Sequence, residues 1–308
     1  AHLLAAGFPV MRGVRVFLLA LVAVLLAVGG LLQARLDAAR PVAALETGKL
    51  YVRSAKALDR AVLSFDALVA DVYWMRAIQH YGGHRRSKTV QKRYDLLYPL
   101  LDLTTALDPY FSAVYYFGSF FLAEPMPSGA GRPDQAVSLL MRGLEFQPDN
   151  WRFAQQAGFI HYWYRRDFTE AAEWFRRAAA MPDAPPWVMA LEATTRAAGG
   201  DLAASRRLWQ QMIETAESDW MRETAQFRLM QVEAHAAIDA LEQVVTAYAL
   251  AHGRPPATWN DLIRAGHLRG VPIDPCGTPF VLEEWGNVAV APLSRLYPLP
   301  ESPGPSGF

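Results

Sequence analysis

The recurrence of proline at positions 148 and 182 constrains the fold of this chain more than any other feature. Each of these prolines follows a stretch in which apolar residues recur at steps of three and four, as in a helix with one apolar face. Pro109 closes a third stretch of this kind. Proline ends a helix because it lacks an N–H and its ring clashes with the preceding turn. The interval between Pro148 and Pro182 predicts a repeating unit of two helices. Such units must stack because none can bury its apolar face alone.

Four units of this kind are expected in sequence. The first combines a helix from Lys56 to Tyr81, stopped by Gly82-Gly83, with a helix from about Thr89 to Leu107 that ends before Pro109. The second opens at Tyr110 with a dense aromatic helix and has an enlarged turn at 124–132, followed by a helix at 133–146. Proline is well tolerated at the first position of that last helix.

The third unit, from Asp149 to Pro182, has the most regular pattern. Its first helix contains Trp151, Ala157, Gly158 and Tyr162, and Ala171, Phe175, Ala178 and Pro182 lie in or after its second helix. Through these residues the unit resembles the tetratricopeptide repeat family. The step from Gly158 to Ala171 is one residue longer than the family pattern. A more divergent fourth unit spans 185–217, with Gly199-Gly200-Asp201 as its turn. An unbroken helical pattern from Trp220 to His252, ended by Gly253, is expected to cap the array.

The resemblance implies a mostly α fold, a helix-turn-helix solenoid whose first helices line a groove that binds other proteins. Aromatic side chains in these helices are the candidate contacts. Arg165, Arg166, Arg176 and Arg177 are the candidates for the rim of the groove, although a solvated helix face explains them equally well. The candidates are Tyr115, Tyr116, Phe120, Tyr162, Trp163, Tyr164, Arg165 and Arg166. Several of these are also packing positions of the repeat, so core packing and partner binding both stay open for each residue.

Composition changes after Gly253. A short helix from Trp259 to Ala265, with Thr258 as its N-cap, precedes two short β-prone runs around residues 284–287 that predict a hairpin. This stretch resembles the C-terminal end of type II secretion pseudopilins, through Asp274, Pro275, Gly277, Pro279 and Phe280. It lacks the pseudopilin context, in which the sheet directly follows an N-terminal membrane helix. If the hairpin unit packs on the last repeat helix, it is a cap and not a separate module.

Residues 16–32 form a run of seventeen positions without a charge, preceded by Arg12 and Arg15. The run is just long enough to cross a bilayer core with basic flanks. A cleaved secretory signal is the competing interpretation. Because the apolar run is longer than a usual signal core, we expect an uncleaved single-pass anchor. Arg12 and Arg15 favour a periplasmic array, whereas basic residues after the run pull the opposite way.

The resulting organisation has five parts. They are an N-terminal tail and anchor at 1–33, a connector at 34–55, the repeat array with its capping helix at 56–252, a helix-plus-hairpin unit at 253–297, and an extended proline-rich tail at 298–308.

The residue types that carry chemistry are sparse. With 30 basic and 30 acidic residues and no basic stripe, nucleic acid is not the expected partner. The single cysteine, Cys276, excludes an internal disulfide and lacks a local base, so a structural turn cysteine is expected. His80 and His84 have the i, i+4 spacing of metal ligands, but the intervening glycines favour a surface turn over a metal site. No cofactor or catalytic motif is found.

The sequence therefore predicts a non-catalytic, membrane-anchored scaffold or accessory subunit of a bacterial envelope complex, such as a respiratory or photosynthetic one. The hairpin unit motivates an alternative, an assembly component of a type IV pilus or type II secretion-like machine. An enzyme would require titratable residues that converge in an enclosed pocket.

Overall fold

The computed structural model describes residues 8–39, 65–88 and 92–300. The chain divides into two compact units, residues 1–53 and residues 54–308. The predicted N-terminal tail at 1–7 and most of the connector at 34–55 lie outside the described residues.

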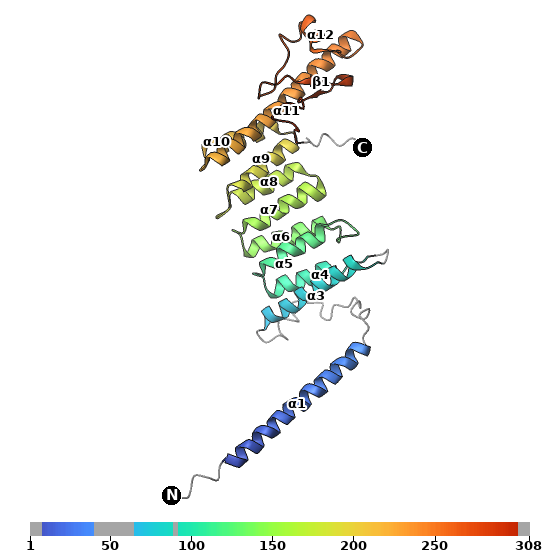
Figure 1. Cartoon of the computed structure of the whole chain (residues 1–308), viewed down its shortest axis with the longest axis vertical. Coiled ribbons are helices and arrows are strands. Elements are labelled where there is room, and N and C mark those ends of the chain that lie inside the picture. Colours follow the sequence, from blue (N-terminus) through green and yellow to red (C-terminus); the bar gives the residue numbers. More distant parts are fainter. Residues whose placement is uncertain (1–7, 40–64, 89–91, 301–308) are drawn as a thin grey trace. The chain divides into compact units, whose positions relative to one another are not determined.

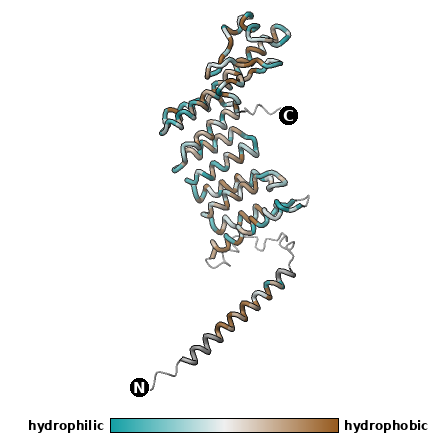
Figure 2. The backbone as a smooth tube through the Cα atoms, in the orientation of Figure 1, coloured by the Kyte–Doolittle hydropathy of each residue, from teal (hydrophilic) through white to brown (hydrophobic). Residues whose placement is uncertain are grey.

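The first unit contains one long helix, α1 (Phe8–Ala39). Its stretch from Phe17 to Arg35 has a mean hydropathy of 2.5 and contains no buried residue, and by length and composition it is suited to cross a membrane. Figure 2 shows hydrophobic residues dominating this stretch, whereas the helices of the second unit mix hydrophobic and hydrophilic residues. Helix α1 continues through residues 34–39, the first part of the predicted connector. They contain no glycine or proline that would end the helix earlier.

The second unit is a stack of antiparallel helix pairs (Figure 1). From α3 to α11 each helix packs on the next along the chain, and α5 also contacts α7. The predicted fold class is confirmed: mostly α, with an apolar N-terminal helix and a small C-terminal hairpin unit. The pairs consist of α3 (Asp66–Arg86) and α4 (Leu97–Leu107), α5 (Ser112–Ala123) and α6 (Pro133–Phe146), α7 (Trp151–Ile160) and α8 (Phe168–Ala179), and α9 (Trp187–Ala198) and α10 (Leu202–Glu214).

Two predicted boundaries in the first pair are wrong. Helix α3 does not stop at Gly82-Gly83 but runs on to Arg86. Glycine only weakens a helix, by about 1 kcal/mol, and Tyr81 beside it is held by a ring stack with Phe121 at 4.1 Å. Helix α4 begins at Leu97, not near Thr89. Pro99 is the reason, since its missing N–H confines it to the first turn of a helix. The predicted residues 56–64 and 89–91 lie outside the described part.

The repeat period is visible in the helix caps. Asp167 and Asp201 repeat the interval between Pro148 and Pro182, and each starts the second helix of its pair. The carboxylate of Asp167 accepts a hydrogen bond from the N–H of Glu170 at 3.0 Å. Asp201 accepts from the N–H of Ala204 at the same distance. Such caps satisfy one of the free donors at a helix start.

The segment between Gly158 and Ala171 contains a π-helical turn. This turn, η2 (His161–Arg165), continues directly from α7. A π turn holds one more residue than an α turn, and such turns are frequent at functional sites. Arg166 follows in the left-handed conformation (φ 54°) and ends the helix. The π turn is therefore a local widening at the end of the first helix, and α7 still packs against α8.

The last long helix, α11 (Asp219–His252), serves two cores. Its first half packs with α9 and α10 through Ala193, Trp209, Ala225 and Val232. Its second half supports the C-terminal unit, which contains α12 (Trp259–Arg264), β1 (Val281–Leu282), a 3-10 turn η3 (Glu284–Gly286) and β2 (Val288–Ala289). The two strands pair antiparallel, Val281 with Ala289 and Leu282 with Val288. The predicted hairpin is thus confirmed.

The shared core of this end joins Leu241, Val245 and Tyr248 of α11 to Leu262, Phe280 and Leu296. The hairpin unit therefore packs on α11. The predicted extended tail begins too early, because Leu299 packs against this core. Residues 301–308 lie outside the described part.

Candidate interaction surface

The aromatic residues of α5 divide between the core and the surface. Tyr115 is fully buried, and burial raises the pKa of its phenol to about 12. It packs against the ring of Phe153 in the next pair, with centroids 5.3 Å apart, so it is a packing residue. Tyr116 and Phe120 are exposed, as is Phe117, which sequence reasoning did not select. Their spacing of i, i+1 and i+4 places them on one side of the helix.

The π turn carries the second group of candidates. Trp163 is 58% exposed, and its ring packs edge-on against Tyr162 with centroids 5.0 Å apart. Tyr162 is half-buried, and its ring also meets that of Phe168. Arg165 and Arg166 are exposed. We call the exposed side chains of Tyr116, Phe117, Phe120 and Trp163 the first-helix surface.

Tyr164 belongs to a polar junction that sequence reasoning missed. Burial and the nearby carboxylate of Glu124 raise the pKa of Tyr164. That carboxylate also accepts a hydrogen bond from the Tyr81 hydroxyl at 2.5 Å and pairs with Arg85 at 3.4 Å. Tyr94 donates to the carbonyl of Pro127 at 3.0 Å, which secures the enlarged turn on the first pair. Glu124 lies next to a proline-rich loop in the sequence. No residue pattern around it predicts that its side chain contacts Tyr81 and Arg85.

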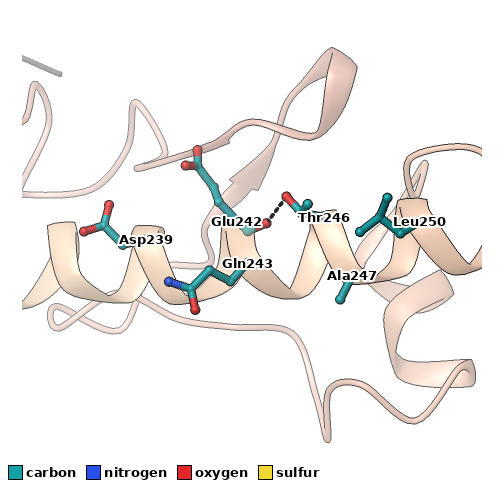
Figure 3. Close-up of a pocket in the computed structure, with 6 residues that line it drawn as sticks. All are labelled: Asp239, Glu242, Gln243, Thr246, Ala247 and Leu250. Atoms are coloured by element: carbon teal, nitrogen blue, oxygen red, sulfur yellow. Dashed lines mark hydrogen bonds between the residues drawn. The ribbon is translucent and has the colours of Figure 1, made fainter. Parts of the chain in front are cut away.

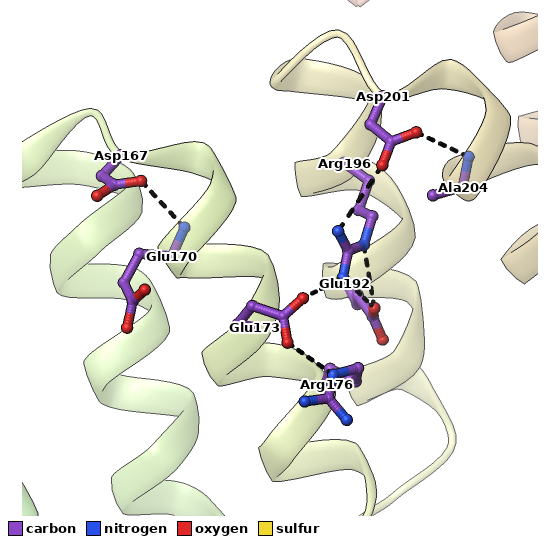
Figure 4. Close-up of polar contacts among 8 residues, drawn as sticks. All are labelled: Asp167, Glu170, Glu173, Arg176, Glu192, Arg196, Asp201 and Ala204. Carbon is purple, nitrogen blue, oxygen red and sulfur yellow. Dashed lines mark hydrogen bonds and ion pairs between the residues drawn. The ribbon is translucent and has the colours of Figure 1, made fainter.

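An ionic link connects α8 to α9 (Figure 4). Arg196 pairs with Glu173 at 2.6 Å and with Glu192 at 3.2 Å. Burial raises the pKa of Glu192, while hydrogen bonds from Arg196 and then Arg176 lower the pKa of Glu173. Arg176 is therefore part of this link, and Arg177 lies over the Trp174 ring at 5.2 Å. Neither arginine is a free rim residue of a groove.

A small cavity of about 100 Å³ lies beside Tyr162. Its walls come from the C-terminal end of α9, from Trp209 of α10, and from Arg228 and His235 of α11, with Pro300 at one side. Arg228 donates to the side-chain oxygen of buried Gln231 at 2.9 Å. Within the described residues, no carboxylate pairs with Arg228. The cavity combines an apolar wall with the cation of Arg228.

A second hollow on α11 is a shallow surface feature (Figure 3). It is lined by Asp239, Glu242, Gln243, Thr246, Ala247 and Leu250. The carboxylate of Glu242 accepts a hydrogen bond from the N–H of Val288 at 3.2 Å, so this side chain anchors the hairpin. Thr246 donates to the Glu242 carbonyl at 2.8 Å, inside its own helix. These contacts give the hollow a structural explanation.

The histidine pair lies on a helix face and not in a surface turn, which corrects the prediction. The rings of His80 and His84 are 4.6 Å apart. Burial, followed by the proximity of His84, lowers the pKa of His80 to about 4. Among the described residues, no third histidine, cysteine or carboxylate completes a metal site.

The turn around Cys276 is organised by Asp274. This buried carboxylate accepts hydrogen bonds from the N–H groups of Cys276 at 2.9 Å and Thr278 at 2.8 Å. It also accepts a short hydrogen bond from the Ser294 hydroxyl. Gly277 supplies the positive φ of 87° that the turn requires. Asp274 and Gly277 thus hold together this turn of the C-terminal unit.

The sequence matches no protein-family model and no curated protein closely enough to show a relationship. The first-helix surface and the apolar span of α1 are therefore the features from which a function is inferred.

Proposed function

We propose that this chain is a non-catalytic, membrane-anchored scaffold or accessory subunit that binds other proteins through a helical repeat array of the tetratricopeptide type. The observation that carries the proposal is the first-helix surface. Its four large aromatic side chains are 38% to 58% exposed, and they come from two neighbouring first helices, α5 and α7 with its π turn. Exposed large apolar side chains that gather on one side of a helix, as on α5, mark interaction sites.

The chemistry of this surface suits a protein partner. Aromatic side chains give large contact areas at a low entropic cost, and arginine joins them among the residues that dominate interface energies. Arg165 and Arg166 supply exposed cations next to Trp163. The helical span of α1 would confine the array to a bilayer and raise its effective concentration near membrane-bound partners.

The setting we propose is the inner membrane of a bacterium, with the array in the periplasm. Arg12 and Arg15 before the span support this orientation under the positive-inside bias. Partners would be subunits of an envelope complex, and a respiratory or photosynthetic complex fits this description. In such a complex, cofactors would belong to the partners.

The alternative, an assembly component of a type IV pilus or type II secretion-like machine, is the weaker proposal. It was motivated by the C-terminal hairpin as a separable module. Because Phe280 and Leu296 share a core with Val245 of α11, the hairpin unit acts as a cap of the array.

Affinity purification of the full-length chain from gently solubilised membranes tests the proposal. We expect stoichiometric partner subunits, and we expect Phe117→Ala combined with Phe120→Ala, or Trp163→Ala alone, to weaken their retention. A central interface aromatic contributes about 2 kcal/mol, or roughly thirtyfold in Kd. Trp220→Ala is the matched control, because Trp220 is 74% exposed but lies outside the first-helix surface.

Equal loss of partners in the Trp220 variant would show that the aromatic surface is not specific. Purification of the chain alone, from membranes in which it is abundant, would contradict the stable-subunit proposal.

A further inference from the structure

The first helix of the array has two opposite faces of different environment. Ala70, Tyr73, Ala77 and Tyr81 form its buried face, at steps of three and four. The opposite face carries Phe65 at the helix start, then Leu68, Val72, Met75 and Ile78, which are 41% to 65% exposed. We call these five side chains the outer stripe. Their periodicity shows that the stripe points away from the rest of the array.

An apolar outer stripe is unusual at the end of a helical stack. Terminal repeats need a polar outer face to stay soluble, because no further unit covers them. At the other end of this array, the apolar side of α11 is covered by the C-terminal unit through residues such as Phe280 and Leu296. Within the described residues, nothing covers the outer stripe of α3 to a similar extent.

We propose that the outer stripe of α3 docks on the surface of the lipid bilayer in which α1 is anchored. This inference rests on the proposed membrane anchor and extends it. The bilayer would then hold the chain at two places, through the spanning helix and through the first helix of the array. This second contact would fix which face of the array is presented to neighbouring subunits.

The size of the stripe favours lipid over a second protein. Each partner in a stable protein interface buries about 800 Å² of its surface. Five large apolar side chains alone provide less surface than this. An interfacial helix needs no complementary shape, because the acyl chains adapt to it, and its binding scales with the apolar area inserted. A weak contact suffices here because the anchor already confines the chain to the membrane.

The charges along the same face are suited to lipid headgroups. Val72, Gln79 and Arg86 lie seven residues apart and therefore on one line of the helix. Arg86 and the following Lys88 are exposed, and no carboxylate pairs with either in the described part of the chain. Such cations attract anionic headgroups. Asp71 is exposed at the edge of the stripe, where the interface is still hydrated.

The chain length also keeps α3 within reach of the bilayer. Residues 40–64 join the end of α1 to Phe65, and 25 residues span at most about 90 Å when fully extended. Every allowed arrangement therefore leaves the start of the outer stripe within that distance of the end of α1.

A spin-label experiment on the full-length chain in liposomes tests this contact. In a Cys276→Ser background, Val72→Cys carries a nitroxide on the stripe, and Gln210→Cys carries it on an exposed position of α10. Liposomes containing anionic phosphatidylglycerol are expected to give a several-fold higher ratio of oxygen to nickel-chelate accessibility at position 72 than at position 210. Charge reversal by Arg86→Glu and Lys88→Glu should move the ratio at position 72 toward the control value.

Three outcomes would overturn the proposal. Free access of the nickel chelate to position 72 would show an uncovered stripe. Spin–spin broadening that disappears on dilution with unlabelled chain would assign the stripe to a second copy. Protection from both oxygen and nickel would show that protein covers it. Alkaline extraction measures the anchor separately: release of the chain contradicts the proposed function itself, whereas retention with an accessible position 72 contradicts only the docking of α3.

Discussion

Two glycines set how closely neighbouring helices approach one another, because glycine has no side chain. A Cβ at Gly158 would lie 2.6 Å from the ring of Phe175, and one at Gly143 would lie 2.9 Å from the rings of Phe153 and Tyr115. Contacts this short cannot be accommodated without displacing a neighbouring ring. Protein interiors are packed too densely for this to be free.

We predict that Gly158→Ala lowers the stability of the array by about 1 to 3 kcal/mol, the usual effect of overpacking. Gly83→Ala is the matched control, because Gly83 is also inside a helix but has nothing within 4 Å of an added Cβ. It should raise stability by about 0.5 to 1 kcal/mol through helix propensity. Urea unfolding followed by circular dichroism compares the two. A neutral Gly158 variant would mean that the crossing of α7 and α8 is looser than described.

A second prediction concerns the buried carboxylate of Asp274. Asp274→Ala leaves the N–H groups of Cys276 and Thr278 and the Ser294 hydroxyl without their acceptor, which should cost about 2 to 4 kcal/mol. Cys276 is the single cysteine of the chain and reports on its own turn. Its reaction with a maleimide is expected to accelerate in this variant and to stay unchanged in Asp239→Ala, an exposed site on α11. Equal rates in both variants would show that Asp274 does not hold the turn.

At the scale of elements, neighbouring helix pairs are joined by apolar contacts and by the ionic link of α8 with α9. Arg196 is central to this link because Glu192 is only 4% exposed and depends on it for a partner. Removing one member of a buried ion pair is strongly destabilising, since the other charge stays buried without compensation.

We predict that Arg196→Met destabilises the chain by about 2 to 4 kcal/mol at neutral pH. The deficit should shrink on acidification. A folded-state pKa that is raised, as for Glu192, gives stability that is present at low pH and lost as pH rises. The lowered pKa of Glu173 gives the opposite dependence.

Removal of Arg196 raises the pKa of Glu192 further and returns the pKa of Glu173 toward its ordinary value. Both changes make the stability deficit of the variant smaller at low pH than at neutral pH. Differences in the urea midpoint at about pH 7 and about pH 5 measure this effect. Glu192→Gln combined with Arg196→Met should recover much of the loss at neutral pH. A loss of stability that does not change with pH would show that the unpaired charge of Glu192 is not its cause.

At the scale of the whole second unit, the C-terminal unit and the array depend on each other. Leu241, Val245 and Tyr248 of α11 are buried only because residues 259–296 cover them. Each of these side chains contributes about 1.5 to 3 kcal/mol when buried.

We therefore predict that removal of residues 253–308 lowers the melting temperature of the remaining chain and promotes its aggregation. Removal of residues 301–308 alone is the control and should change neither. Thermal unfolding with light scattering distinguishes the two truncations. An array that melts unchanged without residues 253–308 would make the hairpin unit a separable module and would strengthen the pilus or secretion alternative.

Much of this architecture follows from local sequence. Helix α6 begins at Pro133 and ends at Phe146 as predicted, and α11 ends at Gly253 as predicted. Pro133 favours the start of α6 because it lacks an N–H, and Gly253 ends α11 because it adopts a left-handed φ. Both effects act within a few residues. Where such signals compete with packing, prediction failed: the two glycines of α3 are outweighed by the tertiary contacts of Tyr81.

The candidate site was predictable only in part, because periodicity identifies a helix but not which apolar side is covered. Tyr115 and Tyr116 are adjacent aromatic residues of one helix, yet one is in the core and the other is exposed. Likewise Leu68, Val72 and Tyr73 all contribute to the apolar period of α3, but only Tyr73 is buried. The choice depends on where the next helix lies, which local sequence does not encode.

The sequence by itself determined the elements: an apolar helix long enough to span a bilayer, helix pairs that recur along the chain, and a C-terminal hairpin. These are set by hydrophobic period, proline, glycine and caps, whose effects act within one or two turns. Only the tertiary structure decided which surfaces remain free, the first-helix surface and the outer stripe of α3, and that the C-terminal unit is a cap. Burial is a property of pairs of elements, so it is fixed only when distant segments pack together.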